Sequence, residues 1–288
     1  MRDPAAALFW AQRNVQAHLP QTTISSVAVG NEVLTLDDTS FIPHLLPAMR
    51  SLRSALSSLG LNVTVTTPHS LSVLQNSYPP SAATFRSDIT PILTFLDRTG
   101  APFLINAYPF FAYKANPAHI PLDFALFQQP NPGLTDPATG LHYDNMLFSQ
   151  VDSVYAALTS AGFRRIPVHV SETGWPSKGD SDEYGASLDN ARKYNGNLIR
   201  KIDSGAGTPM KPNIGLKVHI FALFNENMKP GPTSERNYGI FKPDGTRVYD
   251  LGLGTTASGN SIFPTANSSS SATGSQNSNA NSSNYTSN

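Results

Sequence analysis

The sequence predicts an α/β fold whose parallel strands are joined by crossover helices. Two observations lead to this prediction: apolar runs alternate with stretches of helical periodicity over the first 250 residues, and the runs are apolar almost throughout. Parallel strands have this character because helices cover both faces of their sheet. The strand candidates, in chain order, are Ser26–Val33, Asn62–Thr67, Phe103–Tyr108, Pro167–Glu172 and Leu216–Glu226.

The intervals between these strands carry helical patterns. Apolar side chains recur at steps of three and four residues after Ile42, and the pattern ends at Gly60. Similar spacing predicts a helix from Asp144 to Gly162, with Asp144 as its N-cap. Further helices are predicted at residues 4–19, Thr90–Leu96 and Leu188–Ile202.

The charged residues stop at Asp250, and the chain that follows is rich in Ser and Asn. Such a segment buries too little apolar area to offset the entropy of ordering. We therefore expect a folded domain over residues 1–253 and a disordered linker or tail over residues 254–288. Three Asn-x-Ser/Thr sequons lie in this tail and a fourth begins at Asn62, which favours a secreted glycoprotein. Neither a secretory signal at Met1 nor a lipid-anchor signal is recognisable.

Composition argues against several classes of function. The 288 residues include 20 basic and 20 acidic side chains, a balance that argues against binding of nucleic-acid phosphates. The chain has no cysteine, which excludes disulfides, cysteine–zinc sites and thiol catalysis. It also lacks a His-Glu-x-x-His motif, a phosphate loop, a dinucleotide fingerprint and a serine nucleophile elbow. We therefore expect no metal, no nucleotide and no other cofactor.

Polar residues gather where the predicted strands end. Glu32, Glu172 and Glu226 each follow an apolar run, and a regular pleat would turn all three carboxylates inward at the same end of the sheet. In βα barrels, this end carries the chemistry. Taken singly, a glutamate here could equally be a helix cap or a solvent-exposed ion-pair partner, so their shared position is what indicates a site. His169 and His219 fall on the opposite pleat face and are predicted to be buried, hydrogen-bonded histidines.

Paired carboxylates with aromatic neighbours fit the cleavage of a glycosidic bond. One carboxyl gives a proton to the leaving oxygen, while the other is ionised and attacks the anomeric carbon or activates a water. A sugar ring also needs a flat apolar platform with hydrogen-bonding groups at its rim. Trp175, Tyr108 and Phe110 could form the platform, and Asn31 and Asn106 the rim. The alternative for Trp175 and Tyr108 is packing in the core.

Four segments around these residues resemble the plant endo-1,3-β-glucosidases of glycoside hydrolase family 17. They are Val27–Val33, Asn106–Tyr113, Val170–Ser177 and the region from Phe224 to Gly239, in the order of the family, and the resemblance extends over about residues 3–253. It implies an eight-stranded βα barrel of the TIM type. It also implies hydrolysis of internal β-1,3-glucan bonds with retention, without a cofactor.

The same resemblance assigns roles to individual residues. Glu32 is the expected general acid/base and Glu172 the expected nucleophile, while Glu226, Lys229 and Glu235 match the charged cluster of the family. Lys229 could hold Glu172 ionised or could simply be exposed. The expected partner is a β-1,3-glucan polysaccharide, with no nucleic acid or nucleotide. We expect a monomer, located outside the cell or in the cell wall, and membrane anchoring of a full-length form stays open.

The sequence departs from the family pattern before residue 26. In the family the acid/base glutamate ends the fourth strand, whereas here about 25 residues, mostly one predicted helix, precede the first strand candidate. We therefore expect an incomplete barrel with about five of the eight strands. Two alternatives to an active hydrolase stay open: a non-catalytic glucan-binding or vestigial homologue, and a truncated gene model.

Overall fold

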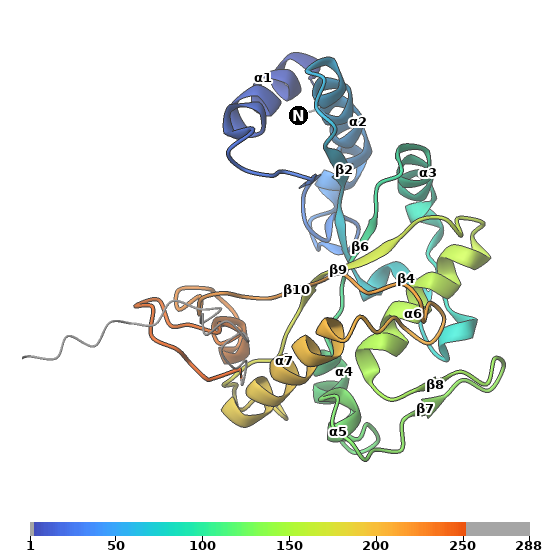
Figure 1. Cartoon of the computed structure of the whole chain (residues 1–288), viewed down its shortest axis with the longest axis vertical. Coiled ribbons are helices and arrows are strands. Elements are labelled where there is room, and N and C mark those ends of the chain that lie inside the picture. Colours follow the sequence, from blue (N-terminus) through green and yellow to red (C-terminus); the bar gives the residue numbers. More distant parts are fainter. Residues whose placement is uncertain (1–2, 252–288) are drawn as a thin grey trace, which may run out of the picture. The chain divides into compact units, whose positions relative to one another are not determined.

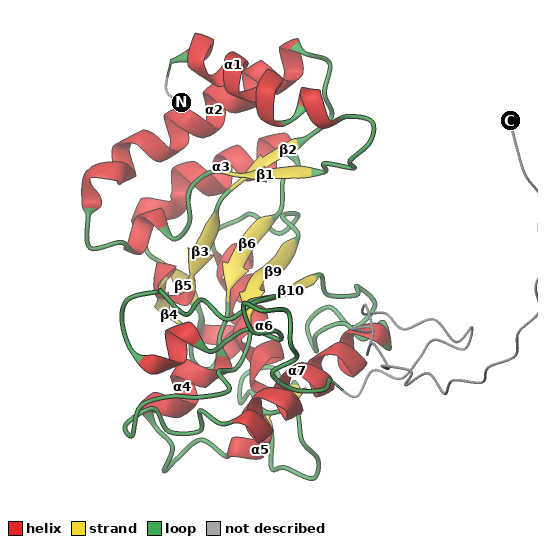
Figure 2. Cartoon of the chain, turned by 90° about the vertical axis from the view of Figure 1, so that its left-hand side faces the viewer, coloured by secondary structure: helices red, strands yellow, loops and turns green. Residues whose placement is uncertain are grey.

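The computed structural model describes residues 3–251, and the tail predicted for residues 254–288 lies outside them. Parallel strands form the centre of this part of the chain, and four of them lie side by side in Figure 2. Their order is β10 (Val218–Ile220), β9 (Val168–Thr173), β6 (Phe103–Asn106) and β3 (Pro68–Ser70). β1 (Ser26–Ala28) pairs in parallel with β2 (Thr64–Thr66), which runs through Thr67 into β3. Each predicted apolar run therefore contains a parallel strand.

Helices connect successive strands, as the periodicity predicts (Figure 1). The α-helices are α1 (Pro4–Asn14), α2 (Ile42–Ser58), α3 (Thr90–Thr99), α4 (Pro109–Ala115), α5 (Leu122–Ala125), α6 (Met146–Ser160) and α7 (Leu188–Asp203). The short 3₁₀ helices are η1 (Gln16–His18), η2 (Val33–Thr35), η3 (Thr39–Phe41), η4 (Leu71–Val73), η5 (Pro80–Ala82), η6 (Ser87–Ile89) and η7 (Thr233–Arg236). Two antiparallel pairs, β4 (Leu74–Asn76) with β5 (Thr84–Phe85) and β7 (Leu134–Thr135) with β8 (His142–Tyr143), lie in the connections.

Two helix predictions need correction. The segment 4–19 is not one helix, because the backbone leaves helical geometry at Val15, with φ −121°, and continues as η1. Asn145, not Asp144, caps α6: its side-chain Oδ1 accepts the N–H of Phe148 at 2.8 Å. The carboxylate of Asp144 instead binds Lys201 at 2.7 Å and so joins the start of α6 to α7.

The apolar core lies between the sheet and the helices that cover it. α6 packs against β9, and Leu147, Val151 and Val154 of this helix are completely buried. Phe103 of β6 and Val170 of β9 are completely buried as well. Full burial of an apolar side chain of this size stabilises a fold by about 1.5–3 kcal/mol. This packing holds β9, one of the strands that end at the polar clusters, against α6.

The predicted regular pleat is wrong at all three strands. In β9 the register shifts between Val170 and Glu172, where burial no longer alternates. The other two strands are shorter than their apolar runs. β1 ends at Ala28, since Gly30 beyond it has a φ of 68°. β10 ends at Ile220, before a cis peptide bond between Phe221 and Ala222. The residues after these strands reach the site through turns instead of continued strand alternation.

The two strand histidines differ from the prediction. His219 is exposed, because β10 stands at one end of the described strand order, although its Nδ1 lies 3.2 Å from the carbonyl oxygen of Val170. His169 is half-buried, and burial followed by the nearby charge of Lys217 lowers its pKa. Within residues 3–251, no helix combines the length and the apolar character that a membrane span requires.

Candidate active site

Glu32 stands in a strained turn directly after β1. Its backbone is left-handed, with φ 54°, a conformation that costs a residue other than glycine about 1–2 kcal/mol. Two hydrogen bonds hold the turn: the N–H of Glu32 donates to the carbonyl of Pro68 at 2.9 Å, and the N–H of Thr35 donates to the carbonyl of Glu32 at 2.8 Å. Strain of this kind is concentrated at functional sites, where the surrounding structure enforces it.

Asn106 connects the turn after β1 to the end of β9. Its Nδ2 donates to Glu32 Oε1 at 2.8 Å and to Asn31 Oδ1 at 3.1 Å. Its Oδ1 accepts the hydroxyl of Ser171 at 2.6 Å, and its backbone pairs with Glu172 on β9, just after a register shift. The amide is 3% exposed. It therefore fixes the side chain of Glu32 beside the strand that carries the second carboxylate.

Tyr108 holds the second carboxylate. Its hydroxyl donates to Glu172 Oε2 at 2.9 Å. Burial, followed by the charge of Glu172, raises the pKa of Tyr108 above its ordinary value, so the phenol stays protonated and remains a donor. The aromatic ring makes edge contacts with Phe111 and Tyr238, and these contacts limit the movement of the hydroxyl.

The ionisation of Glu172 is set by opposing influences. Burial is the largest of them and raises the pKa of Glu172, and the charges of Glu32 and Glu226 act in the same direction. The hydrogen bond from Tyr108 and the charge of Lys229 lower it, and the net result lies above the ordinary value. Asn106 binds the Glu32 carboxylate and pairs with Glu172 on β9, so both carboxyls lie at this end of the sheet.

The predicted charged cluster forms as an ion-pair network. Lys229 Nζ lies 2.9 Å from Glu235 Oε2 and 3.4 Å from Glu226 Oε2, and it stands 5.0 Å from the centre of the Phe221 ring. Burial opposes the charge, but the hydrogen bonds and charges of Glu235 and Glu226 together outweigh it and raise the pKa of Lys229. Lys229 is half-buried and not simply exposed, and its ion-pair partners are Glu226 and Glu235. That it holds Glu172 ionised stays a prediction.

A cleft of about 1010 Å³ opens at Glu32. Glu32, Asn106 and Tyr108 line it together with the exposed rings of Phe111 and Tyr78. The volume is at the upper end of the range for small-molecule sites, about 300–1,000 Å³. Glu172 is not among the lining residues, and Tyr108, which binds its carboxylate, is.

The platform prediction is wrong for two of its three aromatic residues. Trp175 and Phe110 are completely buried and contact each other edge to face, with ring centres 5.3 Å apart. The indole Nε1 of Trp175 donates to the carbonyl of Gly185 at 2.8 Å. Both rings therefore support the site from the core, as the alternative for Trp175 proposed. Tyr108, the third residue of the predicted platform, lines the cleft, and the exposed aromatic residues of the lining are Phe111 and Tyr78.

Sequence reasoning missed Glu183, which lies between β9 and α7. It is 3% exposed, and hydrogen bonds join it to residues on two other connections. A signal was present in the sequence: the chain has only five glutamates, at positions 32, 172, 183, 226 and 235. The other four belong to the candidate site. No group of histidine and acidic residues suited to a metal ion occurs within residues 3–251.

Comparison with known proteins gives one consistent match. The sequence matches the glycosyl hydrolases of family 17 over residues 3–253. Glucan endo-1,3-beta-glucosidase 11 of Arabidopsis thaliana is 59% identical over 261 residues, which cover 88% of this chain and 61% of the relative. Glucan endo-1,3-beta-glucosidase 10 of the same plant is 58% identical over 266 residues, covering 89% and 62%. The chain thus spans about three fifths of the length of these relatives.

Two solved structures share its fold. CJP38, a beta-1,3-glucanase and allergen of Cryptomeria japonica pollen, superposes with a TM-score of 0.82 at 39% identity, covering 86% of this chain and 78% of that one. A structure from a study of two plant beta-glucan endohydrolases with distinct substrate specificities gives 0.78 at 36% identity, covering 87% and 79%. The described part of the chain therefore has their TIM-barrel-like arrangement of parallel strands and helices.

Proposed function

Since the chain belongs to family 17 of the glycosyl hydrolases, we propose that it hydrolyses internal β-1,3-glucosidic bonds in glucans of the callose or laminarin type. The observation that carries this proposal is the pair of carboxylates at the strand ends. Asn106 holds Glu32 at the cleft and Tyr108 holds Glu172 on the neighbouring strand end. A pair of carboxyls on either side of the scissile bond is what glycoside hydrolysis requires.

The proposed reaction is a double displacement with retention. Glu32 protonates the glycosidic oxygen as the bond to the anomeric carbon breaks, and the Glu172 carboxylate attacks that carbon to form a covalent ester. Glu32 then takes a proton from water, and the resulting hydroxide displaces Glu172 and restores both groups. The Glu32 and Glu172 carboxyls are expected to be about 5–5.5 Å apart, the separation of retaining enzymes.

The surroundings of Glu172 suit a nucleophile. A nucleophilic carboxylate must be ionised, while burial of Glu172 favours its protonated form. The Tyr108 hydroxyl at 2.9 Å and the charge of Lys229 oppose this effect. Phe111 and Tyr78, whose rings are exposed in the cleft, are suited to pack against sugar rings.

The strand count and the domain bounds belong to the same proposal. β1, the joined β2 and β3, β6, β9 and β10 correspond in this proposal to five strands of an eight-stranded family barrel. The described strand order does not close, since β1 and β10 are not paired with each other within residues 3–251. Residues 1–253 would be the glycosidase domain and residues 254–288 a linker or tail.

A secreted, monomeric glycoprotein that acts at the cell wall fits this function. Asn62 of the Asn62-Val63-Thr64 sequon is exposed at the start of β2, where an oligosaccharide could be attached. The other three sequons lie outside the described residues. A mass decrease on treatment with a peptide N-glycosidase, absent in Asn62→Gln, would identify glycan at this position in protein purified from the plant.

Reducing-sugar release from laminarin by the purified chain tests the proposed activity. Glu32→Gln and Glu172→Gln are each expected to lower kcat/KM by about 10²- to 10⁴-fold, the usual contribution of a positioned proton donor or acceptor and a conservative minimum for a nucleophile. Asp189→Asn, an equivalent change on the exposed surface of α7, should keep wild-type activity. Binding of laminarin without any product from the wild-type chain would overturn the proposal in favour of a non-catalytic glucan-binding protein.

A further inference from the structure

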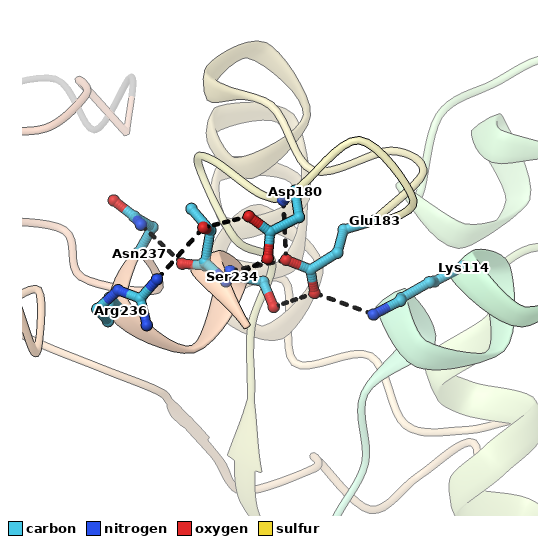
Figure 3. Close-up of polar contacts among 7 residues, drawn as sticks. Lys114, Asp180, Glu183, Ser234, Arg236 and Asn237 are labelled. Carbon is cyan, nitrogen blue, oxygen red and sulfur yellow. Dashed lines mark hydrogen bonds and ion pairs between the residues drawn. The ribbon is translucent and has the colours of Figure 1, made fainter. Parts of the chain in front are cut away.

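Glu183 is a buried carboxylate that bonds to three separate connections at the site end of the sheet (Figure 3). On its own connection, between β9 and α7, its Oε2 accepts the N–H of Asp180 at 3.0 Å. From the connection after β10, Ser234 donates its N–H to Oε2 at 2.9 Å and its hydroxyl to Oε1. From α4, which follows β6, Lys114 Nζ lies 3.0 Å from Oε1. The side chain of Glu183 is 1% exposed.

The connection that carries Glu183 is itself firmly anchored. Asp180 accepts both the N–H of Thr233 at 2.9 Å and its hydroxyl, which ties the same connection to η7 a second time. Gly179 packs closely against this connection, since a Cβ added to it would lie 2.6 Å from Ala186 Cβ and 2.8 Å from Glu183 Cβ. The carboxylate therefore has little freedom to move independently of its partners.

Two partners of Glu183, Ser234 and Lys114, lie close in the chain to groups that act on Glu172. Ser234 immediately precedes Glu235, which holds Lys229 at 2.9 Å. Lys114 lies on α4, a helix that begins directly after Tyr108, and Tyr108 donates to Glu172. Tyr108 and Lys229 both favour the ionised form of Glu172. Glu183 is connected to Tyr108 through Lys114 on α4 and to Lys229 through Ser234 on η7.

We propose that Glu183 is a positioning residue for the hydrolysis proposed above: by joining α4 and η7 to its own connection, it keeps Tyr108 in place against Glu172 and Lys229 in place against Glu235. Glu183 does not touch the reacting atoms. It acts through the geometry of the groups that do, and loss of this geometry should make Glu172 harder to ionise. The charged and titratable groups that affect the ionisation of Glu172 are Tyr108, Glu32, Lys229 and Glu226.

The direction of the effect separates this role from simple electrostatics. Glu183→Gln removes a negative charge, and the loss of a negative charge near Glu172 can only lower the pKa of that carboxyl. Displacement of Tyr108 and Lys229 would instead raise it. An increase in the Glu172 titration midpoint therefore reports positioning, and a decrease reports a direct charge effect.

The test is carboxyl ¹³C NMR of the 288-residue chain labelled at the glutamate side chains. The chain has only five glutamates, so the spectrum holds five side-chain signals, which individual Glu→Gln variants assign. In Glu183→Gln we expect the Glu172 midpoint to rise by about 0.5–1 pH unit, part of the 1–3 units that an opposite charge nearby provides. A midpoint that is unchanged or lower would overturn the proposal.

Two further variants keep the carboxylate and change only its surroundings. Gly179→Ala would bring a methyl group within 2.6 Å of Ala186 Cβ and 2.8 Å of Glu183 Cβ, so the connection that carries Glu183 must shift. This variant should also raise the Glu172 midpoint, although no charge is lost. Ser234→Ala removes the hydroxyl that donates from η7 to Glu183 Oε1 and should give a smaller rise in the Glu172 midpoint. These variants also serve if Glu183→Gln fails to fold, and the absence of a rise in both of them would likewise contradict the proposal.

Asp136→Asn is the matched control for a structural role. Asp136 is completely buried and accepts hydrogen bonds from Ser81, Ala138 and Thr139, but these partners lie on neither α4 nor η7. Its replacement should lower stability without moving the Glu172 midpoint. An equal movement in Asp136→Asn would show that any loosening of the fold produces the effect, and the assignment to Glu183 would be wrong.

Kinetics provide the second measurement. In Glu183→Gln, kcat on laminarin is expected to fall about 10-fold, with KM changed less than about 3-fold, because misplacement of reacting groups affects chemistry more than binding. The acid limb of the kcat profile should move to higher pH together with the NMR midpoint. If the wild-type chain does not hydrolyse laminarin, the proposed function fails, whereas the NMR midpoint still decides the role of Glu183.

Discussion

Replacing Glu183 by glutamine should change how the stability of the protein depends on pH. Burial by itself raises the pKa of this carboxyl, but hydrogen bonds from Ser234 and Asp180 and the Lys114 ammonium outweigh it and lower the pKa from 4.5 to about 2. A depressed pKa in the folded state means that ionisation stabilises the fold. This contribution is complete above about pH 4.5 and is lost as the pH falls towards 2.

The magnitude follows from the size of the shift. A difference of about 2.5 pKa units between folded and unfolded states corresponds to about 3 kcal/mol at neutral pH. By pH 3, more than half of this contribution is gone, a loss of about 2 kcal/mol relative to pH 6. The side chain is 1% exposed, so solvent screening does not reduce the value appreciably.

Urea unfolding of wild type and Glu183→Gln at several pH values measures this quantity. The fluorescence of Trp175, which is completely buried, reports the transition. The difference in unfolding free energy between the two proteins should narrow by about 2 kcal/mol from pH 6 to pH 3. A difference that stays constant over this interval would refute the reasoning, because it would show that Glu183 is not held ionised by its partners.

Three further predictions concern the site itself. Tyr108→Phe removes the hydroxyl that donates to Glu172, so the acid limb of the kcat/KM profile should move up by about 0.5–1 pH unit; an unmoved limb would contradict this. Asn106→Ala frees the Glu32 carboxyl and should lower kcat/KM on laminarin by about 10²-fold, as expected for a misplaced reacting group; activity within 2-fold of wild type would show that Glu32 is positioned by other contacts. Trp175→Phe should lower the unfolding free energy by about 1–3 kcal/mol, less than full truncation of a buried aromatic, with KM for laminarin unchanged. A large rise in KM without loss of stability would instead place the indole against the sugar.

The repeating fold and the positions of the carboxylates were predictable from the sequence for a physical reason. Strands buried on both faces are apolar throughout. A polar residue at the end of such a run is therefore expected where the strand leaves the sheet. Glu32 and Glu172 both satisfy this condition. The structure places both at the same end, joined through Asn106 and the pairing of β6 with β9.

The local geometry was less predictable, since it depends on contacts between distant segments. Strand alternation could not indicate that Glu32 would adopt a left-handed backbone held by Pro68. Aromatic residues after a strand gave no indication of whether they would face the cleft or the core. Burial of Trp175 depends on Phe110 and on the carbonyl of Gly185.

The burial of Glu183 is the clearest example of a feature that local sequence does not predict. Its immediate sequence, with acidic and glycine neighbours, is typical of an exposed turn. Its burial follows from three partners, of which Lys114 lies 69 residues before it and Ser234 51 residues after it. Only the rarity of glutamate in the chain pointed to it.

Trapping the covalent intermediate tests the central proposal most directly. The 2-fluoro group of a 2-deoxy-2-fluoro β-glucosyl donor slows both displacements. A good leaving group on the same donor speeds only the first displacement, so the glycosyl ester accumulates. Peptide mass spectrometry of the labelled wild-type chain should locate this ester on Glu172, and Glu172→Gln should remain unlabelled. An adduct on another residue, or turnover of laminarin with inversion and no adduct, would contradict the assignment of Glu172 as nucleophile and the retaining mechanism.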